Sequence, residues 1–513
     1  MTKRFYVTTP IYYVNDVPHI GHAYTTIAAD VIARHHRQLG EDVFFLTGTD
    51  EHGQKIGRTA QESGVKPIEL ANRVVLRFKD LWERLDITND DFIRTTEDRH
   101  KKAVWEIFKK IRDTGDIYLG VYEGWYDLRN EAFITDSQYE DYMELPESAR
   151  PPLEKLREES YFFRLSNYQQ PLLEYYKAHP EFIRPINRRN EVISFVEGGL
   201  RDLSISRTTF SWGIPVPEDS KHIIYVWFDA LTNYLTAAGF PDNMEQFGST
   251  WPADLHLVGK DILRFHTVYW PAFLMSAGLP LPHQVFAHGW WTVDGEKMSK
   301  SLGNVVDPYR VIDEFGEDIF RYFLLREIPF GQDGDFSRGA IIGRINADLA
   351  NGLGNLLSRT LGMIEKYAES RIPFPGGLES NDEEIKSRTL STSQTVAVSL
   401  GEIAYNKALV AIWDLISLMN KYIDESAPWV LWKKGSIDRL NTVLWVLVET
   451  LRIIAILIYP FIPKSAQKIW ERLGFESALE DERFQVALVW GKIQTGSKID
   501  RGTVLFSRYE VKT

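Results

Sequence analysis

Near the N-terminus, the spacing of apolar positions changes from strand-like to helix-like and back. Residues 5–9 are rich in β-forming side chains, residues 22–39 carry apolar side chains at roughly helical spacing up to Gly40, and residues 43–46 are a continuous apolar run. A strand–helix–strand unit of this length predicts a right-handed crossover within a parallel sheet. Ligands of such sheets bind beyond the carboxyl ends of the strands, where residues 10–22 and 47–53 are expected.

A similar pattern returns after residue 222. Strand-like runs occupy residues 223–227, 255–259 and 285–289, and residues 261–277 are expected to form a helix in spite of Pro271. Residues 115–222 differ in texture, with short β-like runs and charged turns, and we interpret them as an inserted subdomain. Beyond about residue 344 the long segments have helical patterns, with the strongest at 347–367, 387–419 and 440–458.

These patterns predict an α/β Rossmann-type parallel-sheet domain with an inserted subdomain, followed by an all-α bundle. We expect the two halves of the sheet domain at 1–114 and 223–294, the insertion at 115–222, a loop region at 295–345 and the helical domain at 346–513. The most apolar stretch, residues 440–463, contains Glu449 and Arg452. We therefore expect a buried bundle helix there and no membrane span.

Composition restricts the chemistry available to the chain. It contains no cysteine, which excludes disulfides, thiolate-bound zinc and a cysteine nucleophile. No apolar signal segment follows Lys3 and Arg4, and we expect a cytoplasmic protein. The formal net charge is −12, so any contact with RNA must use local basic patches on an acidic body.

The segment His19-Ile20-Gly21-His22 lies where the first predicted helix begins. The N–H groups and the dipole of a helix N-terminus favour an anion, and two imidazoles there can donate to phosphate oxygens. Gly21 would allow close approach to the backbone. Taken alone, the segment is more typical of a histidine-rich helix cap than of an anion site, and a zinc pair with His52 is a further alternative.

Residues 297–301, with the sequence Lys-Met-Ser-Lys-Ser, form a second motif between Gly295 and Gly303. Mobile ammonium groups can neutralise the charge that builds up on departing pyrophosphate. A short basic run in isolation is more often a solvated loop. Together with the histidine segment, in this order and across an α/β pattern, it predicts one polyphosphate held from two sides.

The two motifs resemble the signatures of class I aminoacyl-tRNA synthetases. Residues 8–15 (Thr-Thr-Pro-Ile-Tyr-Tyr-Val-Asn), 47–53 (Thr-Gly-Thr-Asp-Glu-His-Gly) and 225–230 (Tyr-Val-Trp-Phe-Asp-Ala) narrow the resemblance to the methionyl-tRNA synthetases, over nearly the whole chain. The resemblance implies ATP-dependent activation of L-methionine to methionyl-adenylate with release of pyrophosphate. Methionine then passes to the 3′-terminal adenosine of tRNA(Met), initiator tRNA included. Positioning and charge stabilisation carry such a reaction without a protein nucleophile.

The resemblance assigns nine residues to methionine binding. They are Ile11, Tyr13, Asp50, Trp227, Ala230, Leu231, Tyr234, Ile262 and His266. Asp50 matches the carboxylate that holds the amino group, and the others match an apolar, aromatic-lined slot of the kind that a thioether side chain prefers. Considered singly, Trp227 and Tyr234 are also typical of an ordinary core.

The resemblance also implies residues for ATP and for catalysis. His19, His22, Lys297 and Lys300 match the catalytic groups, and the ATP-binding set is Gly21, Gly259, Asp261, His288, Lys297 and Lys300, with Lys260 beside it. Mg²⁺ is expected with ATP, held mainly by oxygens of the substrate.

In the helical domain the resemblance implies anticodon readers at Asn355, Arg359, Pro428 and Trp429. Asn355 and Arg359 lie one helical turn apart and can share a face. A tryptophan can stack on an unpaired base, and Asn and Arg can bond to base edges.

At two places the sequence departs from the family pattern, and there we expect features of other members to be absent. Many members hold a cysteine-bound zinc in the insertion, where this chain has Asp-Leu-Arg-Asn at 127–130, and we expect no structural zinc and no other metal ligand set. Many relatives carry an additional C-terminal dimerising domain, whereas this sequence stops at Thr513. We therefore expect a monomer. We also expect no membrane partner.

Two other classes of function share parts of the pattern. Synthetases for valine, isoleucine and leucine are expected to have a larger insertion, and the cysteine enzyme is expected to use a thiolate-bound zinc. A non-catalytic tRNA-binding protein on the same scaffold would be expected to lose one of the two motifs, and both are intact here.

Overall fold

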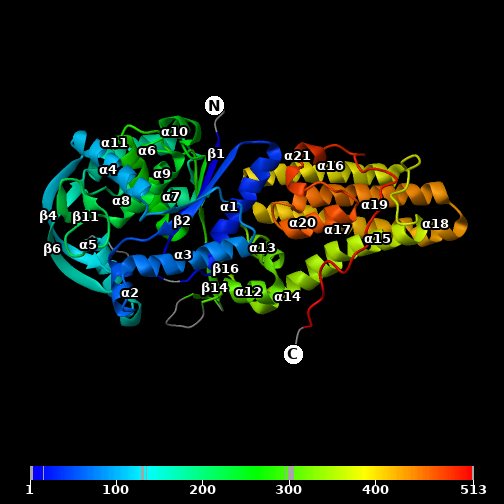
Figure 1. Cartoon of the computed structure of the whole chain (residues 1–513), viewed down its shortest axis with the longest axis horizontal. Coiled ribbons are helices and arrows are strands. Elements are labelled where there is room, and N and C mark those ends of the chain that lie inside the picture. The colour runs from blue at the N-terminus through cyan, green and yellow to red at the C-terminus, as the bar shows by residue number, and fades with distance from the viewer. Residues whose placement is uncertain are drawn as a thin grey trace. The chain divides into compact units, whose positions relative to one another are not determined.

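The structure is a computed structural model that describes residues 4–15, 17–128, 132–134, 136–293, 295–298 and 305–510. Its contacts divide the chain into two compact units that interleave in sequence. Unit 1 comprises residues 1–17, 44–80 and 89–287, and unit 2 comprises residues 18–43, 81–88 and 288–513. Figure 1 labels the elements of both units.

Unit 1 is built on a six-stranded sheet with the order β3-β2-β1-β12-β13-β7. The pairs β1–β12, β2–β3 and β13–β7 are parallel, as the sequence predicts. The strands are β1 (Phe5–Tyr13), β2 (Val43–Asp50), β3 (Asp91–Arg94), β7 (Ile183–Arg184), β12 (Leu255–Gly259) and β13 (Val285–His288). Strand order reverses between β1 and β12, which is the kind of switch point where open α/β sheets bind ligands.

Strand β2 shows why the sheet forms where the apolar run predicts it. All eight of its residues are buried, as expected for a strand covered on both faces. The helices of this unit and of the chain linking its strands are α2 (Gln54–Glu62), α3 (Pro67–Arg84), α4 (Asp98–Asp113), α6 (Gln169–Ala178), α7 (Ile186–Glu197), α8 (Val226–Leu231), α9 (Asn233–Ala238), α10 (Met244–Thr250) and α11 (Trp270–Ser276).

The segment between α4 and α8 contains an antiparallel sheet with the order β5-β4-β6-β8. Strands β4 (Ile117–Asp127) and β6 (Leu153–Phe163) pair along their whole length, flanked by β5 (Ala132–Phe133) and β8 (Leu203–Ser204). Helix α5 (Asp136–Glu144) lies in the same region. A second small antiparallel sheet joins β9 (Ser206–Arg207), β10 (Pro215–Val216) and β11 (Asp219–Ile224).

The predicted strand at 223–227 is wrong in its second half. Strand β11 ends at Ile224 and is antiparallel to its neighbours, and helix α8 begins at Val226. A short apolar run is compatible with either a buried strand or a buried helix, so tertiary packing determines which of the two forms.

The predicted helix at 261–277 forms, but its first turns are irregular. A 3₁₀ turn at Lys260–Ile262 is followed by a π-helical turn at Phe265–Tyr269, and α11 then begins with Pro271 in its first turn. Proline lacks an N–H group and is tolerated best at that position. The irregular backbone therefore lies immediately before the proline.

Unit 2 contains α1 and the C-terminal helices. Their bounds are α1 (Ile20–Leu39), α12 (Pro308–Phe315), α13 (Glu317–Arg326), α14 (Arg338–Arg344), a π-helical segment (Ile345–Gly354), α15 (Asn355–Tyr367), α16 (Ser380–Gly401), α17 (Tyr405–Ser426), α18 (Pro428–Lys434), α19 (Ile437–Ile458), α20 (Pro463–Arg472) and α21 (Phe484–Ala487). Three short strands, β14 (Trp291–Val293), β15 (Glu296–Lys297) and β16 (Gly334–Asp335), form a further sheet.

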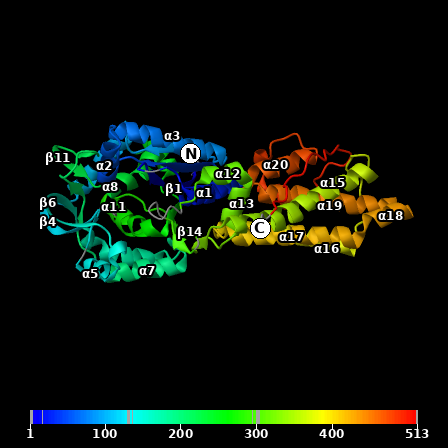
Figure 2. The same cartoon turned by 90° about the horizontal axis from the view of Figure 1, so that it is seen from below.

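The helical bundle confirms the all-α prediction, with one correction. Helices α16, α17 and α19 lie side by side (Figures 1 and 2). The pattern at 387–419 predicts one helix, but α16 ends at Gly401 and α17 begins at Tyr405. Ile403 between them has φ +58°, a left-handed conformation that helices do not contain, and it is buried. Burying that side chain favours the break.

Helix α19 is the one described helix that is long and apolar enough to cross a membrane, and 94% of its apolar window is buried inside the structure. The two buried charges of this helix are paired at 2.6 Å between Arg452 and the Glu449 carboxylate. That carboxylate also accepts hydrogen bonds from the backbone N–H groups of Gly491 and Ile493 at 2.9 and 2.8 Å. The prediction of a buried bundle helix is confirmed.

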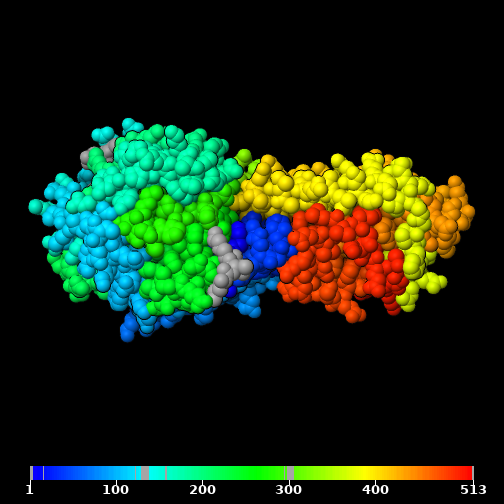
Figure 3. Space-filling view, turned by 90° about the horizontal axis from the view of Figure 1, so that it is seen from above, coloured from blue at the N-terminus to red at the C-terminus, as the bar shows by residue number. Residues whose placement is uncertain are grey.

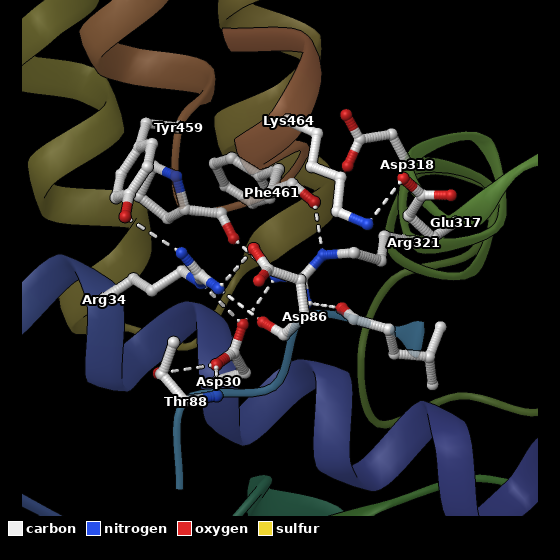
Figure 4. Close-up of polar contacts among 12 residues, drawn as sticks. Asp30, Arg34, Asp86, Thr88, Glu317, Asp318, Arg321, Tyr459, Phe461 and Lys464 are labelled. Carbon is white, nitrogen blue, oxygen red and sulfur yellow. Dashed lines mark hydrogen bonds and ion pairs between the residues drawn. The ribbon is translucent and has the colours of Figure 1, made fainter. Parts of the chain in front are cut away.

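Helix α1 is held in unit 2 by a buried ionic network, drawn in Figure 4. Arg34 donates to Asp30 at 2.8 Å, to the hydroxyl of Tyr459 at 2.9 Å and to the Asp86 carboxylate at 2.9 Å. Arg321 of α13 donates to Asp30 at 2.7 Å. Two helices distant in sequence are thereby joined through one carboxylate.

The C-terminal end of α1 contacts α21. The ring of His35 meets Phe484 edge-on at 5.0 Å, and Arg483 donates to the carbonyl of Arg37 at 2.8 Å. In the space-filling view the blue atoms of the N-terminal part lie beside the red atoms of the C-terminal part (Figure 3). The helix that begins with the histidine motif is therefore packed against the end of the helical bundle.

Candidate active site and anticodon-binding residues

Asp50 is the last residue of β2, at the carboxyl end of the parallel sheet, as the sequence predicts. It is buried, its carbonyl accepts from the N–H of Val14 at 3.2 Å, and its carboxylate lies 3.5 Å from the N–H of His52. A buried acid at this edge is suited to holding one substrate ammonium group.

Tyr234 and His266, both predicted methionine residues, form a buried hydrogen bond of 2.7 Å. The Nδ1 of His266 lies 3.0 Å from the carbonyl of Ile262, so this nitrogen carries the proton and Nε2 accepts from the tyrosine hydroxyl. Burial lowers the pKa of His266 to about 4, and it is therefore neutral at pH 7. Tyr234 and His266 therefore form a polar wall that is held in place by their hydrogen bond and carries no charge.

The remaining predicted pocket residues divide into two groups by burial. Ala230 and Leu231 are buried, whereas Ile11, Tyr13, Trp227 and Ile262 are only partly buried while packing against the core of unit 1. Partly exposed apolar groups around a buried polar pair are what an apolar slot open on one side requires.

Phe265 lies beside Trp227, although the sequence does not predict it as a pocket residue. The two rings are stacked with centroids 3.7 Å apart and planes 6° apart. The sequence separation of the two residues is 38, and a phenylalanine between predicted helix positions gives no periodic signal of such a partner. Only the π-helical turn places the ring there.

The predicted ATP residues of unit 1 lie at the end of β12. Gly259 ends that strand, and Lys260 and Asp261 form the 3₁₀ turn that follows it. Gly259 and Lys260 are half-buried and Asp261 is exposed. These positions again lie at the carboxyl edge of the sheet.

His19 and His22 form the N-terminal cap of α1 in unit 2. Nδ1 of His19 accepts from the N–H of Gly21 at 3.1 Å, and Nδ1 of His22 accepts from the N–H of His19 at 3.2 Å. The rings stack with centroids 3.7 Å apart. A Cβ on Gly21 would lie 2.9 Å from the His19 ring, so a larger residue here would displace that ring from its place in the cap.

This cap fixes the proton positions of both imidazoles. Because each Nδ1 accepts, the neutral ring carries its proton on Nε2, which can donate to a phosphate oxygen. Burial, and then the neighbouring His19, lower the pKa of His22 well below its ordinary value. The helix-cap and anion-site interpretations of the sequence are thus compatible, because the cap itself orients the donors.

His288 is joined to the first turns of α1. Its Nε2 lies 2.7 Å from the hydroxyl of Thr25, which also donates to the carbonyl of Gly21 at 3.1 Å. The ring of Tyr24 meets His288 and Trp291 edge-on at 5.1 and 5.7 Å. The histidine motif and the segment leading to the lysine motif are therefore packed together within unit 2.

The lysine motif is described in part. Strand β15 (Glu296–Lys297) pairs with β14 in an antiparallel register that sets Lys297 opposite Thr292. The predicted Lys300 lies outside the described residues. The roles of both lysines stay predictions from the sequence.

The predicted anticodon readers belong to helices α15 and α18 of unit 2. The Asn355 amide donates to Asn420 at 2.9 Å, and Arg359 donates to Asp424 at 2.5 Å, so both readers of α15 are held by α17. Pro428 is buried in the first turn of α18, and the next residue, Trp429, is 39% exposed. An exposed tryptophan is suited to stacking on a base.

The segment 127–130, where the sequence leads us to expect no zinc, is described up to Leu128. Asp127 ends β4, and the N–H of Leu128 donates to the carbonyl of Pro152 at 3.0 Å. Arg129 and Asn130 lie outside the described residues. The expected absence of zinc stays a prediction.

Comparisons with known proteins agree with this architecture. The family described as "tRNA synthetases class I (M)" matches residues 5–149 and 146–361, and "Anticodon binding domain of methionyl tRNA ligase" matches residues 372–512. A Methionine--tRNA ligase of Caldanaerobacter subterraneus subsp. tengcongensis is 53% identical over all of this chain and 80% of its own length. The Methionine--tRNA ligase of Rickettsia felis is 50% identical over 99% of both chains.

A solved structure is similar over the same extent. "Mycobacterium tuberculosis methionyl-tRNA synthetase in complex with methionyl-adenylate" has a TM-score of 0.94 at 48% identity, covering 99% of this chain and 100% of that one. The parallel sheet, the histidine and lysine motifs and the helical bundle together define a class I aminoacyl-tRNA synthetase. Within that class, the chain belongs to the methionyl-tRNA synthetase family.

Membership of the methionyl-tRNA synthetase family decides between this function and the two alternative classes of function that the sequence left open. The chain is an enzyme, a methionine–tRNA ligase that activates methionine with ATP and charges tRNA with it. The predictions of fold class and of function are confirmed. A synthetase for another amino acid and a non-catalytic tRNA-binding protein do not account for these comparisons.

Proposed function

We propose that the carboxyl edge of the unit 1 sheet binds methionine. The Asp50 carboxylate would hold its ammonium group, and the side chain would enter the slot of Ile11, Tyr13, Trp227, Ala230, Leu231, Tyr234, Ile262 and His266. The buried chain from the Tyr234 hydroxyl to His266 and the Ile262 carbonyl supports this most directly. Its polar atoms bond to each other and stay neutral, so the slot suits an uncharged, polarisable thioether.

The nucleotide would be held by the remaining predicted residues. In unit 2, the imidazole Nε2–H groups of His19 and His22 would donate to phosphate oxygens, Gly21 and His288 would bind ATP, and Lys297 and Lys300 would neutralise the leaving pyrophosphate. In unit 1, Gly259 and Asp261 would bind ATP. When bound, Mg²⁺ would screen the phosphate charge. Mg²⁺ keeps oxygen ligands and is usually bound through substrate phosphates, so ATP oxygens would supply most of its ligands.

The chemistry needs no covalent intermediate with the protein. A carboxylate oxygen of methionine attacks the α-phosphorus, the bond to the β-phosphate bridge oxygen breaks, and pyrophosphate leaves with its electron pair. A ribose hydroxyl of the terminal adenosine of tRNA then attacks the activated carbonyl, losing its proton, and AMP leaves. The protein contributes orientation and fixed donors.

In the helical domain, Trp429 would stack on an anticodon base while Asn355 and Arg359 bond to base edges. Pro428 would set the start of α18 that presents this tryptophan. Asn420 and Asp424 hold the two polar readers from α17. The substrate would be tRNA(Met), including the initiator.

Four further expectations are proposals with simple tests. Sedimentation velocity would decide whether the chain is a monomer, and metal analysis of the purified protein would detect a stoichiometric zinc. Fractionation of cells would test the cytoplasmic location. The domain boundaries proposed from the sequence could be tested by limited proteolysis.

Amino-acid-dependent pyrophosphate exchange across all twenty amino acids tests the proposed pocket. We expect methionine to give the highest kcat/KM, with loss of that preference when the Trp227 or Tyr234 wall is altered. A preference for valine or isoleucine would contradict the assignment of the slot.

A further inference from the structure

Asp229 lies on α8 between pocket residues Trp227 and Ala230, and it is fully buried. Its two carboxylate oxygens meet two imidazoles. Oδ2 lies 2.7 Å from Nδ1 of His52, and Oδ1 lies 2.7 Å from Nε2 of His100. His52 follows β2, and His100 belongs to α4. One carboxylate therefore ties together three separate elements of unit 1.

The protonation of this cluster follows from its surroundings. Burial alone would raise the pKa of Asp229, but the charge of His52 and the hydrogen bonds from both histidines outweigh burial and lower it. Asp229 is therefore an anion that accepts from two N–H groups. Nδ1 of His100 lies 3.1 Å from the hydroxyl of Thr236 on α9, which completes the partners of that ring.

The segment that carries Asp50 is held by hydrogen bonds to several other parts of unit 1. Its Glu51 side chain bonds to Arg94 at 2.7 and 3.0 Å and to Thr96 at 2.5 Å, which ties it to β3 and the residues after it. The Glu51 carbonyl accepts from the indole N–H of Trp212 at 2.6 Å. His52 supplies the tie to α8. Asp50 precedes these two anchored residues directly.

We propose that Asp229 is a positioning residue for methionine recognition: through His52 it fixes the Asp50 carboxylate relative to the apolar wall on α8. The inference rests on the proposed role of Asp50 as the partner of the substrate ammonium. Because Asp229 lies on the same helix as Trp227, Ala230 and Leu231, one buried carboxylate sets the distance between the charged and apolar halves of the pocket. Small misplacements of such groups have large effects on binding and rate.

Two probes, each lacking one of the two charged groups of methionine, test the proposal. L-Methioninol keeps the ammonium group and lacks the carboxylate, whereas 4-(methylthio)butanoate keeps the carboxylate and lacks the ammonium group. Their inhibition constants against methionine would be measured in pyrophosphate exchange. For Asp229→Asn we expect about a 10-fold or greater loss of methioninol affinity and a similar rise in the KM of methionine. The affinity for 4-(methylthio)butanoate and the KM of ATP should stay within about 2-fold.

The control is Asp318→Asn, another buried aspartate, which lies in unit 2 and accepts from the N–H of Ser465. It should lower stability and leave the ratio of the two inhibition constants unchanged. If Asp229→Asn does not fold, His100→Gln provides the second test, because a glutamine amide can still donate to Asp229. We expect it to weaken methioninol by about 3-fold and to spare 4-(methylthio)butanoate.

The outcomes separate this proposal from the assignment of Asp50. Equal weakening of both probes by Asp229→Asn, or no weakening of either, overturns the positioning role. If Asp50→Asn removes the preference for methioninol while Asp229→Asn keeps it, only the positioning role fails. If the wild-type enzyme does not discriminate between the probes, the role of Asp50 and the proposal both fail.

Discussion

The guanidinium of Arg321 and the carboxylate of Asp30 form an ion pair of 2.7 Å in which both side chains are completely buried. Asp30 also accepts from Arg34 and from the hydroxyl and N–H groups of Thr88. The remaining N–H groups of Arg321 donate to the carbonyls of Leu85, Pro460 and Phe461. The helix with the histidine motif at its start thus shares a satisfied buried network with the turn that ends α19.

Asp30→Asn should destabilise the protein strongly. Removing one partner of a buried ion pair leaves an uncompensated charge, which costs about 3–5 kcal/mol of unfolding free energy. Urea denaturation followed by tryptophan fluorescence would measure the loss. Asp313→Asn is the matched control, because the pair of Asp313 with Arg84 is exposed and should contribute less than about 1 kcal/mol. Equal effects of the two changes would contradict the importance of burial.

The same carboxylate predicts acid sensitivity. Burial would raise the pKa of Asp30, but Arg34 and Arg321, with hydrogen bonds from Arg34 and Thr88, lower it from 3.8 to about 2. The folded pKa is depressed, so the stabilisation is present above pH 4 and is lost as the pH falls from 4 towards 2. It amounts to about 2 kcal/mol. Denaturation midpoints across that window should fall less steeply in Asp30→Asn than in the wild type.

The lowered pKa of His266 predicts a second effect of pH on stability, at higher pH than the effect of Asp30. Its folded pKa of about 4 is below the ordinary value of 6.5 because of burial. The unfolded chain takes up a proton first, so this contribution to stability is complete above pH 6.5 and is lost as the pH falls towards 4. NMR titration of the His266 ring should show no protonation between pH 8 and 5. Titration near 6.5 in the folded protein would contradict the neutral polar wall.

Tyr234→Phe should impair methionine binding more than folding. It removes the hydroxyl that bonds to His266 and leaves a buried acceptor unsatisfied, at a cost of about 1–3 kcal/mol. We expect the KM of methionine in pyrophosphate exchange to rise by about 5- to 100-fold. Tyr176→Phe also removes a buried hydroxyl, which bonds to the carbonyl of Thr267, and should leave that KM unchanged. A similar rise in both variants would indicate general damage to unit 1.

Lys300→Ala should slow adenylate formation far more than it weakens methionine binding. The ammonium charge is expected to matter most as pyrophosphate leaves, and loss of such a group lowers kcat by about 100-fold or more. Single-turnover formation of the adenylate would measure the step, with Lys421→Ala on α17 as the control. Equal losses in the rate and in methionine affinity would argue against a role in the transition state.

Trp429→Ala should separate the two reactions. Loss of one stacked base costs about 1–3 kcal/mol, so the KM for tRNA should rise while pyrophosphate exchange is spared. Trp105→Ala is a control with the same 39% exposure, on α4 of unit 1. A defect in exchange as large as the defect in charging would exclude a purely anticodon role.

The sequence determined the parts of this protein that depend on local pattern. Strands β1, β2, β12 and β13, helix α1 and the helical C-terminal half follow from apolar spacing, and the two motifs with three further segments sufficed to indicate the family. These features are local because backbone preferences and helix caps act over a few residues. The stacked histidines of α1, bonded within residues 19–22, are an example.

Tertiary structure alone decided the conformation of residues 225–227, the break at Ile403 and the partners of the buried charges. His52 and Asp229 are 177 residues apart, and Asp30 and Arg321 are 291 apart. No periodicity links such positions, because a buried charge is stabilised by whichever donor the folded chain brings within hydrogen-bonding distance. The sequence therefore specifies which side chains can perform the chemistry, and the fold determines how they are held.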